Sequence, residues 1–94
     1  MKIEILSNED EAIKVCNALC VPSRLTILRH IAKKPKFIVQ IAEELNMTVA
    51  AVALNMNILE EAGLVEIRYE PGDRGTRKMC KLAVAKIVIE VIKQ

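Results

Sequence analysis

The sequence predicts an α+β fold that is mostly α-helical and forms one domain over residues 1–94. Two observations support this prediction. Apolar residues recur with a helical period through most of residues 9–62, and two alternating segments then flank a turn rich in proline and glycine. The chain is 52% hydrophobic, so its 94 residues can bury a core although they lie near the lower size limit for independent folding.

Composition excludes several classes of protein. Phe37 and Tyr69 are the only aromatic residues, which argues against binding of single-stranded nucleic acid or RNA by base stacking. No apolar run approaches the roughly 20 residues of a membrane helix, and the N-terminus is unlike a signal peptide, so we expect a cytoplasmic protein with no membrane partner. Three cysteines, an odd number, do not suggest a secreted disulfide framework.

The first half of the chain predicts a short strand followed by three helices. Residues 2–6 alternate as a strand, and residues 7–11 begin a helix that runs to about Leu19. We expect Ala12, Ile13, Cys16 and Leu19 to form its apolar stripe. The second helix starts at Pro22 and ends before Pro35, and the third spans about 38–45. The core-facing positions expected in these two helices are Leu25, Leu28, Ile31 and Ala32, and then Ile41, Ala42 and Leu45.

A very short connection joins the third helix to the fourth. Asn46 suits the left-handed conformation that ends a helix, and Thr48 suits the cap of the next, over about 49–62. Such a connection makes the two helices cross steeply, as in a helix-turn-helix. Val52, Met56 and Leu59 share one face of the fourth helix, and Gly63 ends it.

The rest of the chain predicts strands. Residues 64–70 and 77–82 read as a hairpin around a turn at 71–75, so the fold is a winged helix-turn-helix with a β-hairpin wing. The tail at 86–92 could form a helix, but its β-branched residues favour a short terminal strand. The terminal strands at 2–6 and 86–92 would pair with each other, within a subunit or across a two-fold axis, with Ile87, Ile89 and Val91 on a packed surface.

Three motifs resemble ArsR-type winged-helix regulators over about residues 12–82. Residues 18–28 read ALCVPSRLTIL, residues 41–45 read IAEEL and residues 58–65 read ILEEAGLV, all at the family's spacing. The resemblance implies a transcription regulator that binds double-stranded DNA as a homodimer. Residues 37–41 lack the Cys-x-Cys pair of the metal-sensing members, and the strand-like tail resembles a subgroup in which terminal strands replace the C-terminal helix.

The predicted DNA-binding residues lie on two elements. The recognition helix, about 48–62, would enter the major groove, where Asn can bind adenine and small apolar groups can touch a thymine methyl. The wing, about 65–82, would contact the backbone or the minor groove through basic residues. The predicted set is Thr48, Val49, Ala50, Ala53, Leu54, Asn57, Arg74, Arg77 and Lys78.

Other polar residues do not suggest a catalytic or metal site. Arg24 could contact phosphate or pair with a glutamate such as Glu60 or Glu61. Cys16 and Cys20 lie at i, i+4, but two thiols are too few for a specific metal site, and one histidine cannot supply a catalytic set. We therefore expect no cofactor, no bound metal and no enzyme activity.

Two alternatives to a homodimeric DNA-binding regulator stay open. The recognition helix contains no Arg or Lys and exposes Val49 and Leu54, which would also suit a winged helix used as a protein–protein assembly module. The domain could also be the DNA-binding head of a longer sensor protein.

Overall fold

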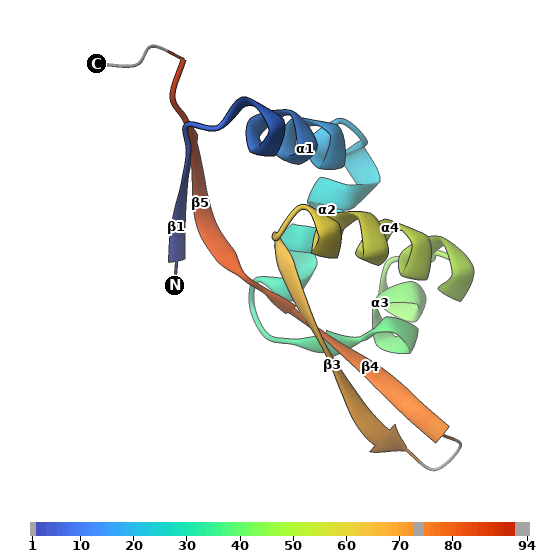
Figure 1. Cartoon of the computed structure of the whole chain (residues 1–94). Coiled ribbons are helices and arrows are strands. Elements are labelled where there is room, and N and C mark those ends of the chain that lie inside the picture. The colour runs from blue at the N-terminus through green and yellow to red at the C-terminus, as the bar shows by residue number, and fades with distance from the viewer. Residues whose placement is uncertain (1, 73–74, 92–94) are drawn as a thin grey trace.

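The computed structural model describes residues 2–72 and 75–91, in which four helices and five strands are arranged as a winged helix-turn-helix (Figure 1). The elements in chain order are β1 (Lys2–Leu6), α1 (Glu9–Leu19), α2 (Pro22–Ile31), β2 (Lys36–Phe37), α3 (Ile38–Glu44), α4 (Val49–Glu61), β3 (Val65–Gly72), β4 (Gly75–Leu82) and β5 (Val84–Ile89). The α+β fold class predicted from the sequence is confirmed. None of the helices described is long and apolar enough to cross a membrane.

The helix-turn-helix forms as its local sequence predicts. Asn46 adopts a left-handed φ of 55° after α3, and the Thr48 side chain accepts a hydrogen bond of 3.0 Å from the Ala51 backbone N–H. At the other end of α4, Gly63 has a φ of 78°, a conformation that costs glycine little. These caps fix both ends of α4 and thereby its position against α3.

The core lies where α2, α3 and α4 meet the base of the wing. Val52, Met56 and Leu59 of α4 are fully buried, as predicted. They pack in one cluster with residues of every other helix and with Leu64, Val65 and Cys80 at the base of the hairpin. Because one face of α4 is anchored in this way, its opposite face points outward.

Two helix faces differ from the sequence prediction. In α1 the buried residues are Val15 and Ala18, whereas Ile13 and Cys16 are exposed. Ala12 and Leu19 of the predicted stripe pack against the core, but Ile13 and Cys16 do not, because helical spacing alone does not say which neighbour a helix packs against.

In α2, Ile27 is buried beside the predicted Leu28 and Ile31, while Leu25 and Ala32 are exposed. The physical reason is the same in both helices. Each carries more apolar residues than one face can bury, and tertiary packing chooses among them.

The wing has the predicted bounds of 65–82, but its two strands are longer than predicted. β4 lies between β2 and β3 in a three-stranded antiparallel sheet, and the short β2 was not predicted. Pro71 pairs with Thr76, and Gly72 pairs with Gly75, so these residues extend the strands instead of forming the turn predicted at 71–75. Because β3 is an edge strand, the missing N–H of Pro71 removes no hydrogen bond that a second neighbour would need.

The terminal strands pair within the chain. β1 and β5 run parallel, with Ile5 opposite Val88 and Leu6 opposite Ile89, and they form a separate two-stranded sheet. The predicted tail strand is confirmed, shifted to 84–89. Ile87 packs against the core of its own subunit, whereas Ile89 and Val91 are exposed on it, so the homodimer surface expected for these two stays a prediction.

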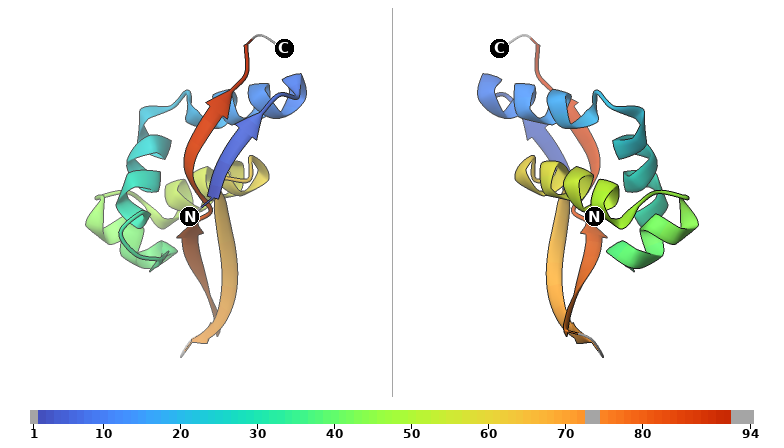
Figure 2. Two further views of the ribbon diagram at one scale, coloured as in Figure 1. Left: turned by 90° about the vertical axis from the view of Figure 1, so that its left-hand side faces the viewer. Right: turned by 90° about the vertical axis from the view of Figure 1, so that its right-hand side faces the viewer.

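The wing and the terminal sheet project from opposite ends of the helical body (Figures 1 and 2). The molecule is elongated, with principal extents of 53 × 22 × 21 Å. One end therefore presents the hairpin, and the other presents the sheet formed by β1 and β5.

Candidate nucleic-acid interface

The outward face of α4 presents most of the residues predicted to contact bases. Thr48, Val49, Ala50, Leu54 and Asn57 are exposed. Ala53 is half-buried, because it faces the wing and not open solvent. This face combines apolar and uncharged polar side chains and carries no positive charge, since α4 contains no Lys or Arg. Contacts from it would therefore favour A·T pairs, through Asn57 to adenine and through methyl groups to thymine.

Basic side chains reach this region from the wing. The guanidinium carbon of Arg77 lies 4.1 Å from the centroid of the Phe37 ring, and the Lys78 ammonium lies 5.7 Å from the Tyr69 ring. A planar guanidinium stacks well on an aromatic face, so Phe37 restrains Arg77 before any ligand binds. Arg74, the third basic residue predicted here, lies outside the residues that the structure describes.

Gly72 leaves room for the Arg77 side chain. A β-carbon built on Gly72 would lie 2.8 Å from Cγ of Arg77 and 3.0 Å from its Cδ. Any other residue at position 72 would push Arg77 aside. The Arg77 side chain therefore passes close to the β3 backbone at Gly72 and extends to the ring of Phe37.

A groove separates α4 from the wing. It has a volume of about 530 Å³, and its walls come from the start of α3, from α4 and from β4. Its lining residues are Phe37, Ile38, Val39, Gln40, Val49, Ala53, Thr76, Arg77 and Lys78. The groove thus brings together Val49, Ala53, Arg77 and Lys78, four residues that the sequence predicted from two separate elements.

Arg24 has a structural position that the sequence did not predict. Its Nε donates to Oδ1 of Asn55 at 3.1 Å, and its Nη1 donates to the carbonyl oxygens of Asn17 at 3.0 Å and Ala18 at 3.4 Å. Within the described residues, Arg24 forms no ion pair with Glu60 or Glu61, the partners that the sequence suggested. Arg24 instead ties the C-terminal end of α1 to the middle of α4.

The cysteines do not converge. Cys16 and Cys20 are exposed on α1 and its cap, while Cys80 is buried in the wing sheet. Burial raises the pKa of the Cys80 thiol to about 11, so it stays protonated. Within residues 2–72 and 75–91, no three His, Cys, Asp or Glu side chains gather closely enough to hold a metal ion.

Comparisons with known proteins agree with this geometry. Residues 22–68, which run from α2 into β3, match the model of a helix-turn-helix domain family. A crystal structure of a possible transcriptional regulatory protein from Mycobacterium bovis (fragment 1–100) is 32% identical, with a TM-score of 0.72, and the alignment covers 79% of this chain and 75% of that one.

The solution structure of the same Mycobacterium bovis fragment is described as a homodimeric winged helix-turn-helix DNA-binding domain of a possible ArsR-family regulator. It is also 32% identical, with a TM-score of 0.71, over 79% of this chain and 65% of that one. The chain belongs to the ArsR-type winged helix-turn-helix family of transcription regulators.

A more distant structure supports the fold alone. HlyU from Vibrio cholerae is 20% identical to this ArsR-type chain, with a TM-score of 0.69 over 83% of this chain and 78% of that one. No curated protein sequence matches.

Sequence reasoning about this ArsR-type domain missed two residues that shape the interface. The ring of Phe37 restrains the Arg77 side chain, and Oδ1 of Asn55 accepts a hydrogen bond from Arg24. The one available signal was that Phe37 is one of only two aromatic residues in the chain. No local pattern pointed to Asn55, because its partner lies 31 positions away.

Proposed function

We propose that this ArsR-type domain regulates transcription by binding duplex DNA with the exposed face of α4 in the major groove and the wing on the adjacent backbone or minor groove. The groove between α4 and the wing supports this proposal, because Arg77 is already held at its edge by Phe37. A restrained cation loses less conformational freedom on meeting phosphate than a free one.

A salt titration with random duplex DNA tests the wing. Replacing Arg74 and Arg77 with Ala should weaken binding to all sequences alike and lower the slope of log affinity against log salt by about two units, since each phosphate contact contributes about 0.9. Arg74→Lys/Arg77→Lys is a matched control, because it keeps both positive charges and should therefore keep the slope. An unchanged slope in the double variant would remove the wing from the interface.

We further propose that the domain works as a homodimer formed by α1 and the terminal sheet. Two-stranded sheets are rarely stable alone, and parallel strands are usually covered on both faces. Here Ile3 and Ile5 are 55% and 61% exposed, Ile13 of α1 is 51% exposed, and each strand has one unpaired edge. A second copy would cover these groups and place two α4 helices for successive half-sites about one DNA turn apart.

Sedimentation velocity tests this dimer. Ile5→Lys should yield a monomer, whereas Leu54→Lys, which alters an equally exposed residue on α4, should leave the dimer intact. Deleting residues 86–94 removes most of β5 and should yield a monomer or an aggregate. A truncated protein that stays a folded dimer and binds DNA normally would rule out the terminal sheet as the interface.

A second candidate function is protein–protein assembly through α4. The observation that favours it is the exposure of Val49 and Leu54 at 49% and 63% on α4, a helix that contains no Lys or Arg. The same Leu54→Lys variant separates the two functions. Loss of self-association or partner binding, together with no DNA binding by the wild type at low salt, would favour assembly.

A further inference from the structure

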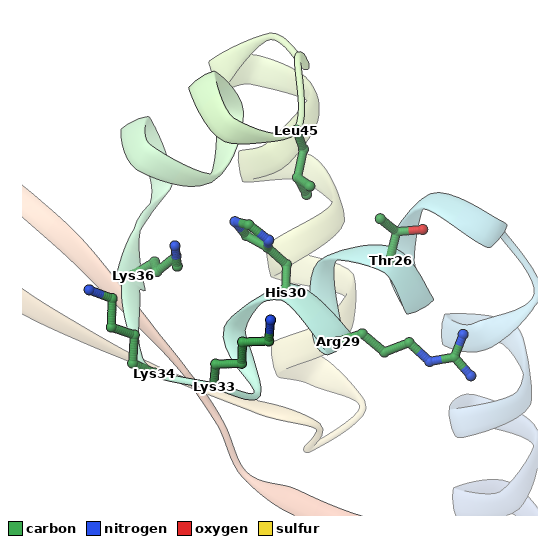
Figure 3. Close-up of a pocket in the computed structure, with 7 residues that line it drawn as sticks. All are labelled: Thr26, Arg29, His30, Lys33, Lys34, Lys36 and Leu45. Atoms are coloured by element: carbon green, nitrogen blue, oxygen red, sulfur yellow. The ribbon is translucent and has the colours of Figure 1, made fainter.

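A second pocket is lined by a cluster of basic side chains. It has a volume of about 680 Å³ and is bordered by the C-terminal half of α2, the connection to β2 and the end of α3. Figure 3 shows His30, Lys33 and Lys36 around its centre, with Arg29 and Lys34 at its rims. None of its lining residues lines the groove between α4 and the wing.

The two sites adjoin the same short strand, β2. Lys36 lines the basic pocket and its neighbour Phe37 lines the groove. Successive residues of a strand point to opposite sides, so these two side chains diverge. A duplex seated in the groove would approach the side of Phe37 and not that of Lys36.

The pocket carries more positive charge than the protein neutralises. Among the described residues, Glu44 is the one carboxylate paired with the lining: His30 Nε2 lies 2.7 Å from Oε1 of Glu44, and Lys36 contacts the same oxygen. Arg29, Lys33 and Lys34 take part in none of the ion pairs of the described residues. Residues 23–41, from which all five basic groups come, contain no acidic residue.

The helix dipole explains part of this arrangement. Arg29 and His30 occupy the last turn of α2, where cations stabilise the helix end. It does not explain why Lys33, Lys34 and Lys36 continue the charge through the connection and into β2. Several cations around one concave surface match the chemistry of linked phosphates, to which guanidinium and ammonium groups donate charge-assisted hydrogen bonds.

We propose that this pocket binds a phosphate-bearing polyanion, through Lys33 and Lys34 together with Arg29, outside the surface assigned to base recognition. Lys36 and His30 are paired with Glu44 and line the bottom of the pocket, beneath the bound ligand. The phosphates could belong to a free oligophosphate or to a stretch of DNA backbone that leaves the main interface. Both sources require the same cations, and the experiment distinguishes them.

The first arm measures free oligophosphate by isothermal titration calorimetry, with inorganic tripolyphosphate as the probe and without DNA. Wild type should bind with a defined stoichiometry, and the Lys33→Gln/Lys34→Gln variant should bind at least about tenfold more weakly. The variant Lys14→Gln/Lys81→Gln removes the same charge from exposed positions outside the pocket and should bind as wild type does. Equal weakening in both variants would show only a general charge effect and would overturn the proposal.

The second arm measures the salt slope of DNA binding. A slope lower by about two units in Lys33→Gln/Lys34→Gln would assign the pocket to DNA backbone. An unchanged slope with pocket-dependent tripolyphosphate binding would assign it to a free oligophosphate. If tripolyphosphate does not bind through these lysines and the DNA slope is also unchanged, the proposal is wrong.

Discussion

Arg24 offers a direct test of how the helices are held together. Its guanidinium donates to the Asn17 carbonyl at 3.0 Å and to Oδ1 of Asn55 at 3.1 Å, with a longer contact to Ala18 at 3.4 Å. The last turn of α1 contains no basic residue, so Arg24 supplies the cation that suits this negative helix end. Arg24→Ala therefore removes a link among three helices and leaves Asn55 without this donor.

The expected loss follows from these contacts. A hydrogen bond to a charged group contributes about 1.5–3 kcal/mol, and Arg24 is only half-buried, so we expect Arg24→Ala to lower the free energy of unfolding by about 2 kcal/mol. For a domain of this size the melting temperature should then fall by about 8–16 °C. Arg24→Lys should recover part of the loss, because an ammonium cannot reproduce the fork of donors.

Urea unfolding followed by circular dichroism provides the assay, at one protein concentration because a dimer's stability depends on it. Arg68→Ala is the control: Arg68 is exposed on β3, and its variant should stay within about 0.5 kcal/mol of wild type. A double-mutant cycle with Asn55→Ala should give a coupling of at least about 0.5 kcal/mol. Full stability of Arg24→Ala, combined with a lower salt slope for DNA binding, would refute this reasoning and assign Arg24 to phosphate.

Three further predictions concern the thiols, the charge network and the core. In the native protein a thiol reagent near pH 8 should modify the exposed Cys16 and Cys20 but not Cys80. Cys80 is buried, and burial raises the pKa of its thiol to about 11. Fast modification of all three thiols without denaturant would contradict the burial of Cys80. Lys36 and His30 hold the pKa of the Glu44 carboxyl below its usual 4.5, so this carboxylate stabilises the fold above that pH, and the stabilisation is lost as the pH falls through its lowered pKa. Chemical denaturation should accordingly show wild type more stable than Glu44→Gln at neutral pH, with the difference shrinking as the pH falls below 4.5. A difference that stays constant as the solution is acidified would have another cause. Leu59→Ala empties a fully buried position and should cost about 2–5 kcal/mol, measured by thermal unfolding, and a loss below about 1 kcal/mol would mean that the core repacks around it.

The helix-turn-helix and most element boundaries could be predicted from the sequence because they depend on local chemistry. Asn46, Thr48 and Gly63 each act within one turn of their own position, through a left-handed φ or a capping hydrogen bond. The spacing of Val52, Met56 and Leu59 identified the buried face of α4, and hence its exposed face, since little else on that helix competes for burial. The positions of most predicted base-contacting residues on the molecular surface follow from this periodicity.

Only the tertiary structure decided which apolar faces are covered and which distant side chains meet. Ile13 was predicted on the apolar stripe of α1 but is exposed, and Ile27 is fully buried although it was not among the predicted core positions of α2. Burial depends on the neighbouring element and not only on spacing within a helix. The Arg24–Asn55 contact joins residues 31 positions apart, and Arg77 reaches Phe37 through the register of β4 on β2. Such contacts depend on how the helices and strands pack, and no local pattern encodes them. The sequence determined by itself what each segment could become, and long-range packing determined which side chains the assembled surface brings together.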